Sequence, residues 1–245
     1  MNPTDRFSNR AADYVAARPS YPQAAIDVLF DGLGDPREVL VADIGAGTGI
    51  SSRVLAARGA RVLAIEPNKA MRDAAEMHER VEWIAATGEE TGLGEASVDL
   101  VTAFQAFHWV DHAKALREFI RILRPGGRAA AVYNERDESD PFTAAYGDLV
   151  RRYQMDDTEQ RRTGALDAFE AFEWRTPRRV TFANVQVLDL AGIAARARSS
   201  SYLPKDGAAG DALHAELADR FAQHARSGLV SLVMQTIVAT GDSGG

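Results

Sequence analysis

The chain has 245 residues, of which 46% are hydrophobic, and its net charge is −7. This length fits one α/β domain with an insertion, and the composition supplies enough apolar residues for a sizeable core. The acidic balance argues against a nucleic-acid-binding surface, which needs clustered lysine and arginine. The absence of cysteine excludes disulfides, thiolate nucleophiles and cysteine metal ligands.

The two ends of the chain carry no targeting pattern. Residues 1–10 are polar and lack the apolar centre of a secretory signal. No apolar run reaches the length of about 18 residues that a transmembrane helix needs. We therefore expect a cytoplasmic protein without a membrane partner. Residues 241–245 are rich in glycine and serine, and we expect them to form a flexible tail.

Short apolar runs alternate with helical patterns through the first half of the chain. Asn68 and Asp111 are suited to cap the helices that follow the second and fourth apolar runs. Strands separated by helices imply right-handed crossovers and a parallel sheet, which binds its ligand beyond the carboxyl ends of the strands. The predicted strands are residues 39–44, 61–65, 81–85, 98–104 and 129–133.

This alternation ends after residue 133. Residues 134–177 are polar and helical with interspersed aromatic residues, and we interpret them as an inserted cap that sets specificity. Its aromatic side chains either pack the cap on the sheet or contact substrate. The predicted domains are an N-terminal helical lid segment (1–38) and one domain over residues 39–240. The later predicted elements are strands at 179–183 and 229–239 and helices at 191–199 and 208–226.

A glycine-rich loop, Asp-Ile-Gly-Ala-Gly-Thr-Gly at residues 43–49, lies between the first predicted strand and the next helix. Glycine lets the chain turn tightly and lets a ligand approach the backbone, so the loop indicates a nucleotide-like cofactor. The dinucleotide fingerprint needs glycine at the sixth position, where this chain has Ile50. Glu66 closes the second strand, where a carboxylate can accept hydrogen bonds from ribose hydroxyls. An NAD-dependent oxidoreductase is thus the weaker alternative.

The loop resembles motif I of the class I S-adenosylmethionine-dependent methyltransferases. Residues 64–68 resemble the family's acidic ribose-binding strand end, 87–89 its adenine-bordering segment and 123–127 its entry into strand five. The resemblance implies S-adenosylmethionine as cofactor. It also implies a Rossmann-like α/β fold: a seven-stranded, mostly parallel sheet with an antiparallel last strand, helices on both faces and a helical cap insertion.

A narrower resemblance concerns the N-terminal segment and residues 105–109, Gln-Ala-Phe-His-Trp. Both are similar to the methyltransferase-11 and trans-aconitate-methyltransferase-like group, which methylates small molecules. The atom that receives the methyl group is O, N or C, and the sequence does not distinguish among these. The acceptor molecule is either a carboxylate-bearing compound or a natural-product metabolite. The alternative is a methyltransferase that acts on tRNA or on protein. The acidic composition disfavours tRNA as the substrate.

Candidate cofactor residues follow from the loop and from the resemblance. Tyr14 and Arg18 are suited to bind the carboxylate of the cofactor, although Arg18 is equally suited to pair with a surface acid. Asp43 is either a cofactor contact or an acceptor that shapes the loop. The predicted cofactor-binding residues are Tyr14, Arg18, Gly45, Ala46, Gly47, Thr48, Gly49, Glu66, Pro67, Met71, Gly88, Glu89, Gln105 and Ala106.

His108 is the first candidate for catalysis, because it follows the fourth predicted strand and histidine titrates near neutral pH. In the alternative interpretation, His108 and Trp109 form a structural floor of the site. Tyr21 is a second candidate, facing the acceptor. Ser199, Ser201 and Tyr202 are candidates to reach the pocket from the C-terminal helix, although Tyr202 is equally suited to the core. We expect no metal site, since no histidine pair has metal-ligand spacing with a carboxylate.

Overall fold

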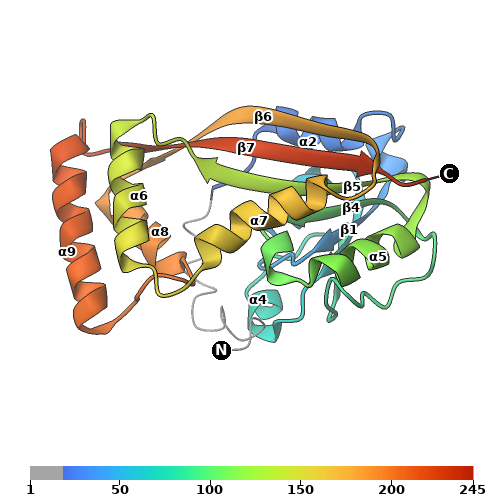
Figure 1. Cartoon of the computed structure of the whole chain (residues 1–245), viewed down its shortest axis with the longest axis horizontal. Coiled ribbons are helices and arrows are strands. Elements are labelled where there is room, and N and C mark those ends of the chain that lie inside the picture. The colour runs from blue at the N-terminus through green and yellow to red at the C-terminus, as the bar shows by residue number, and fades with distance from the viewer. Residues whose placement is uncertain (1–18, 245) are drawn as a thin grey trace.

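The computed structural model describes residues 19–244, which form a seven-stranded sheet with the strand order β3-β2-β1-β4-β5-β7-β6 (Figure 1). Strands β1 to β5 pair in parallel, whereas β7 is antiparallel to both of its neighbours. The predicted mostly parallel sheet with an antiparallel last strand is confirmed. The strands are β1 (Leu40–Ile44), β2 (Arg61–Ile65), β3 (Val81–Ile84), β4 (Val98–Phe104), β5 (Leu123–Arg136), β6 (Arg175–Leu188) and β7 (Val230–Asp242).

Helices cover both faces of the sheet, as predicted. Helices α2 and α3 bury apolar side chains in one cluster on β1, β2 and β4, and α5 and α7 contribute to the cluster on the opposite face. None of the helices within residues 19–244 is long and apolar enough to span a membrane. The helices are α2 (Gln23–Phe30), η2 (Pro36–Glu38), α3 (Ile50–Ala57), α4 (Lys69–Asp73), η3 (Phe107–Trp109), α5 (His112–Ile122), α6 (Pro141–Tyr153), α7 (Thr158–Glu170), α8 (Leu190–Ser199) and α9 (Gly207–His224).

Local sequence explains where two of these helices begin. The carboxamide oxygen of Asn68 accepts hydrogen bonds from the amides of Ala70 and Met71 at the start of α4. The carboxylate of Asp111 accepts one from the amide of Lys114 at the start of α5. Each side chain satisfies amides that have no partner within the helix, so both predicted N-caps are confirmed.

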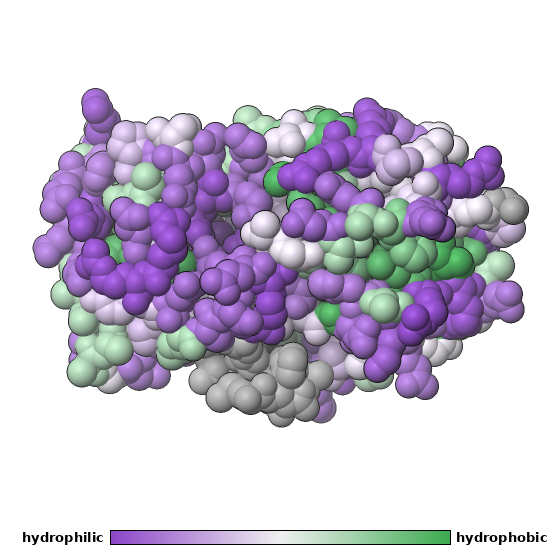
Figure 2. All heavy atoms as spheres, viewed as in Figure 1, coloured by the Kyte–Doolittle hydropathy of each residue, from purple (hydrophilic) through white to green (hydrophobic). Residues whose placement is uncertain are grey.

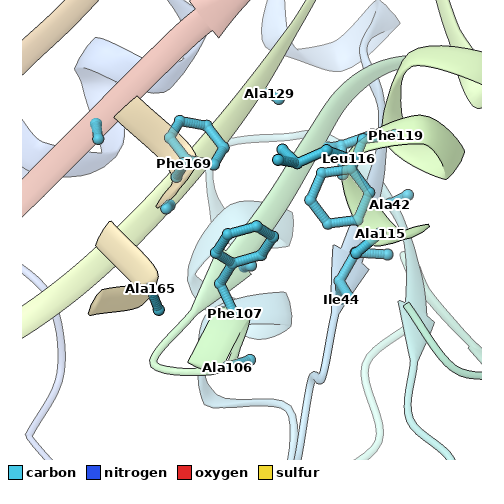
Figure 3. Packing of buried hydrophobic residues seen from close by; sticks show 14 of the residues in the cluster. Ala42, Ile44, Ala106, Phe107, Ala115, Leu116, Phe119, Ala129, Ala165 and Phe169 are labelled. Carbon is cyan, nitrogen blue, oxygen red and sulfur yellow. The ribbon is translucent and has the colours of Figure 1, made fainter. Parts of the chain in front are cut away.

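An aromatic cluster fixes α7 to the sheet. Figure 3 shows the rings of Phe107 (η3), Phe119 (α5) and Phe169 (α7) turned toward one another over alanines of the strands. The Phe107 ring lies 5.7 Å from Phe169 in an edge-on contact and 5.9 Å from Phe119. Because all three rings are fully buried, they anchor α7 beside the segment that follows β4.

Helices α6, α8 and α9 form a lobe beyond the carboxyl end of β5, at the left of Figure 1. They share a separate apolar cluster that includes Tyr146, Ile193 and Leu217. Figure 2 shows a mostly hydrophilic outer surface over α6 and α9, consistent with apolar side chains that point inward. The segment predicted as one cap, residues 134–177, is therefore divided between two parts of the fold: α6 belongs to this lobe, whereas α7 packs against the sheet.

The structure differs from the sequence expectations at both ends of the described chain. Residues 23–30, expected in a lid segment, form a helix whose apolar side is buried against the sheet. At the other end, β7 continues to Asp242, whose carboxylate accepts a hydrogen bond from Arg128 at 2.8 Å. Gly241 suits this strand because Trp174 lies where a Cβ atom would be placed, at 2.1 Å. The ordered strand thus includes residues expected in the tail.

Candidate active site

A cavity of about 310 Å³ lies where the carboxyl ends of β1, β2, β3 and β4 meet, the usual ligand position in such sheets. Its volume falls within the range of small-molecule sites, roughly 300–1,000 Å³. The glycine loop and Glu66 line one part of it, and the segment after β4 lines another. Helix α7 and the segment after α8 complete the wall with Thr158, Arg162, Ser201 and Tyr202.

The glycine loop turns tightly between β1 and α3. Gly45 has a φ of +64°, and a Cβ atom there would lie 2.6 Å from the Cβ of Ala106. Only glycine permits both this backbone conformation and this approach of the loop to the segment after β4. The loop backbone is therefore a wall of the cavity, as expected from the sequence.

Glu66 supports the loop from the end of β2. One carboxylate oxygen accepts a hydrogen bond from the amide of Gly47 at 2.9 Å, and the other accepts one from the amide of Asn68 at 2.8 Å. Burial raises the pKa of Glu66 above its ordinary value, although the two amides oppose this shift. Each carboxylate oxygen keeps a second lone pair, and Glu66 lines the cavity, so it has acceptor capacity for ligand hydroxyls.

Asp43 is a structural acceptor at the end of β1. It is fully buried and accepts hydrogen bonds from the hydroxyls of Ser51 and Ser52, both at 2.7 Å, and of Thr102 at 2.9 Å. Burial raises its pKa, and the three hydroxyls oppose the shift. Asp43 connects β1, β4 and the first turn of α3, so the structure supports the loop-shaping role.

The structure brings most of the predicted cofactor residues to the same cavity. Ala46 instead lines a smaller adjoining cavity, and Thr48 and Gly49 line neither. Thr48 is fully buried, and Gly49 has a φ of +77° as the N-cap of α3. Tyr14 and Arg18 lie outside the described residues. The predicted cofactor residues that line the main cavity are Gly45, Gly47, Glu66, Pro67, Met71, Gly88, Glu89, Gln105 and Ala106.

Gln105 connects β4 to η3 in a strained conformation. Its φ is +53°, which is uncommon for a residue other than glycine. Its amide donates to the carbonyl of Val132 at 2.8 Å, and its side chain donates to the carbonyl of Asn134 at 3.2 Å. These contacts with β5 hold the strained turn, and such strain is concentrated at functional sites.

His108 lines the cavity and is 7% exposed. The phenol oxygen of Tyr133 accepts a hydrogen bond from the His108 amide at 3.1 Å and lies 3.4 Å from the ring nitrogen Nδ1. The His108 ring also lies 4.6 Å from the ring of Trp109. His108 thus combines a contact within the core, which fits the structural interpretation, with a position on the cavity, which fits the catalytic one.

A smaller cavity of about 50 Å³ adjoins the first, and Gln105, Arg162 and Tyr202 line both. Tyr21 lies on this smaller cavity with its ring edge-on to Phe104, at 4.7 Å between ring centroids. Tyr21 is therefore placed beside the cofactor loop rather than in the main cavity. The position fits its predicted role toward an acceptor, which stays a prediction.

Arginines of the smaller cavity form a network that the sequence motifs do not reveal. Arg162 (α7) donates to the Glu135 carboxylate at 2.7 Å and to the Asn134 carbonyl at 3.1 Å. Arg136 (β5) pairs with Glu159 (α7). Burial favours a raised pKa for Glu159, but the hydrogen bond and charge of Arg136 outweigh it and hold the pKa below its ordinary value. The only sequence signal was the location of these residues in the predicted insertion.

The Nε atom of Arg162 is buried and has no hydrogen-bond partner among the described residues. The Arg162 side chain is 12% exposed. A buried guanidinium N–H without a partner is costly unless a ligand or water satisfies it.

Within residues 19–244, no group of three or more histidine, aspartate or glutamate side chains is arranged to hold a metal ion.

Comparison with known proteins identifies the central part of this chain. Residues 42–131 match the family described as the methyltransferase domain. An uncharacterized methyltransferase of Mycobacterium tuberculosis is 41% identical over 148 residues, which are 60% of this chain and 59% of that protein. An uncharacterized methyltransferase-like protein of Schizosaccharomyces pombe is 32% identical over 152 residues, 61% of this chain and 59% of that protein. The chain thus matches less than two thirds of the length of these relatives.

The fold agreement extends beyond this central segment. A structure from Anaeromyxobacter dehalogenans, assigned as a type II methyltransferase, aligns with a TM-score of 0.70 and 26% identity. The alignment covers 92% of this chain and 97% of that chain. The similarity therefore includes the lobe and the antiparallel strands, which lie outside the matched domain.

Proposed function

We propose that this chain, which belongs to the class I S-adenosylmethionine-dependent methyltransferases, transfers a methyl group to a small molecule. The observation that carries the proposal is the cavity at the carboxyl ends of β1 to β4, walled by the glycine loop and Glu66. The substrate and the transfer reaction of the whole protein are part of this proposal. The cytoplasmic location expected from the sequence stays a prediction.

The residues of the cavity fit S-adenosylmethionine, the cofactor of the class. Glu66 has free lone pairs for ribose hydroxyls, and Pro67 and Met71 offer an apolar surface for the adenine. Gln105 and Ala106, which line the same cavity, would border the methionine part. When bound, this cofactor supplies an electrophilic methyl carbon attached to a sulfonium sulfur. An acceptor lone pair would bond to this carbon as the carbon–sulfur bond breaks, with neutral S-adenosylhomocysteine as the leaving group.

We further propose that the acceptor bears a carboxylate, which is one of the substrate types the sequence leaves open. Arg162 lies on both cavities, and its Nε–H has a vacant donor position in the described structure. Arginine binds carboxylates with charge-assisted hydrogen bonds. An ionised carboxylate already has lone pairs for attack, so positioning and water exclusion are the tasks left to the protein.

Ligand binding tests the cofactor assignment. S-adenosylhomocysteine is expected to raise the melting temperature of the protein, and its affinity is measured by isothermal titration calorimetry. NAD is the matched comparison, because the glycine loop is the feature that both cofactor classes use. Stabilisation by NAD together with no response to S-adenosylhomocysteine would overturn the proposal in favour of an oxidoreductase.

The acceptor is tested with S-adenosylmethionine labelled in the methyl group and panels of small carboxylic acids, amines, phenols, tRNA and protein. A methyl ester is cleaved by mild base and releases labelled methanol, whereas N- and C-methyl products keep the label. We expect base-labile label from the acids. Arg162→Met should lower kcat/KM about tenfold or more, the effect of a lost hydrogen bond to a charged group. Arg152→Met is the control, because Arg152 pairs with Glu216 outside both cavities.

Two results would contradict the carboxylate acceptor. The first is label that resists base and comes from the amines or phenols, and the second is an unchanged kcat/KM in Arg162→Met. Labelling of tRNA or protein alone would favour the macromolecular alternative. The acidic net charge of −7 disfavours RNA among these.

A further inference from the structure

The two cavities of the site share part of their walls. The residues that line both are Gly45, Phe104, Gln105, Arg162 and Tyr202. In the proposed reaction the cofactor lies in the main cavity, and Arg162 binds the carboxylate of the acceptor. The methyl group would then pass from one to the other where the cavities adjoin. Polar side chains on this shared wall are therefore placed to act on the reacting groups.

The carbonyl of Asn134 holds the side chain of Gln105. Strand β4 ends at Phe104, opposite Val132 of β5, so β4 offers no partner to the next carbonyl on that side of β5, which is that of Asn134. This oxygen instead accepts hydrogen bonds from Nε2 of Gln105 at 3.2 Å and from Nη2 of Arg162 at 3.1 Å. One carbonyl thus holds Gln105 and Arg162 beside each other.

The same contact determines how the carboxamide of Gln105 is turned. A carbonyl oxygen only accepts hydrogen bonds, so the NH₂ group of Gln105 faces Asn134 and the oxygen Oε1 lies on the other arm of the planar amide. Among residues 19–244, no group donates a hydrogen bond to Oε1. The strained φ of +53° is maintained at this residue. Gln105 therefore brings an unused acceptor to the wall that the two cavities share.

We propose that Oε1 of Gln105 binds the methyl-bearing sulfonium of S-adenosylmethionine, so that the site distinguishes the charged cofactor from its neutral product, S-adenosylhomocysteine. The inference rests on the proposed methyl transfer and deepens it. A positive sulfur polarises the C–H bonds of its methyl group, and polarised C–H groups form weak hydrogen bonds with carbonyl oxygens. The product has neither the methyl group nor the charge, so this attraction ends when the methyl group has been transferred.

An amide oxygen suits this position better than a carboxylate does. A carboxylate would repel the carboxylate of the acceptor that Arg162 is proposed to bind. It would also be a nucleophile that competes with the acceptor for the methyl group. The neutral amide of Gln105 attracts the sulfonium through its dipole and is a poor nucleophile.

Isothermal titration calorimetry of the full chain with S-adenosylmethionine and with S-adenosylhomocysteine, in the absence of acceptor, tests the proposal. Gln105→Met keeps the length of the side chain and removes its amide. The lost contact with Asn134 affects both ligands alike, whereas the lost Oε1 affects only the charged one. We expect the Kd of S-adenosylmethionine to rise about threefold or more beyond any rise for S-adenosylhomocysteine. Equal changes in the two Kd values would overturn the proposal.

Sinefungin provides a second charged probe, because a protonated amine replaces the methyl group and its sulfonium. An ammonium donates a stronger, charge-assisted hydrogen bond, so Gln105→Met should raise the Kd of sinefungin about tenfold relative to that of S-adenosylhomocysteine. An unchanged ratio for sinefungin would contradict the role of Oε1. Gln223→Met is the control, because Gln223 is exposed on α9 outside both cavities, and it should leave all three Kd values unchanged.

Nuclear magnetic resonance of the unsubstituted protein decides the question if Gln105→Met does not fold. The protein is saturated with S-adenosylmethionine labelled with ¹³C in the methyl group. A C–H···O hydrogen bond moves the methyl proton signal downfield of that of the free cofactor, and an upfield or absent shift would overturn the proposal. If the unsubstituted protein binds neither S-adenosylmethionine nor S-adenosylhomocysteine, the proposed function fails. If it binds both and Gln105→Met weakens both equally, only the role of Gln105 fails.

Discussion

Replacing Glu66 by glutamine tests the cofactor site most directly. The carboxylate accepts the amides of Gly47 and Asn68 with one oxygen each. Glutamine has the same shape, but its NH₂ group would replace one carboxylate oxygen. This group cannot accept a hydrogen bond from the backbone amide or from a ribose hydroxyl. The loss of one hydrogen bond to a charged group costs about 1.5–3 kcal/mol. The Kd for S-adenosylhomocysteine should therefore rise roughly 10- to 150-fold.

Isothermal titration calorimetry at neutral pH measures this change, and thermal melting of the unliganded protein shows whether Glu66→Gln is folded. Glu82→Gln is the matched control, because Glu82 lies exposed on β3 outside the cavity. Its affinity should equal that of the unsubstituted protein. A folded Glu66→Gln protein that binds S-adenosylhomocysteine within twofold of the unsubstituted chain would refute the assignment of Glu66.

Three further substitutions test the loop, the core and the acid stability. Gly45→Ala places a Cβ 2.6 Å from that of Ala106 at a positive φ, so calorimetry should show a Kd for S-adenosylhomocysteine raised about tenfold or more; unchanged binding would show that the loop moves freely. Phe169→Ala removes a fully buried ring and should lower the free energy of unfolding in urea by about 3–5 kcal/mol; a cost below about 1 kcal/mol would argue against the anchoring of α7. The hydrogen bond from Arg121, together with Thr91, lowers the pKa of Glu118 from 4.5 to about 2. A carboxyl whose pKa is lowered on folding stabilises above its unfolded pKa, and that stability is lost as pH falls toward the folded value. Glu118→Gln should therefore flatten the fall of unfolding free energy between about pH 4.5 and 2, and an unchanged slope would contradict this account.

Short-range pattern was sufficient for the parallel half of the sheet. The residues predicted as the second and fourth strands are those of β2 and β4, and the caps at Asn68 and Asp111 have their predicted partners. Such features depend on side-chain periodicity and on contacts within a few residues, which a sequence displays directly. Strand β5 is longer than predicted, because it pairs with β7 from Arg128 to Arg136 and because Leu123 at its start pairs with Val98 of β4.

The sequence by itself determined the cofactor class, since the glycine loop and the strand-end Glu66 are local features whose chemistry follows from residue type and order. Only the tertiary structure placed Arg162 on the site and brought the Tyr133 hydroxyl to His108. Arg162 reaches the cavity because the Phe169 anchor returns α7 to the sheet, and the Tyr133 hydroxyl meets His108 from a neighbouring strand. These contacts join residues far apart in the chain, and no pattern along the sequence encodes them.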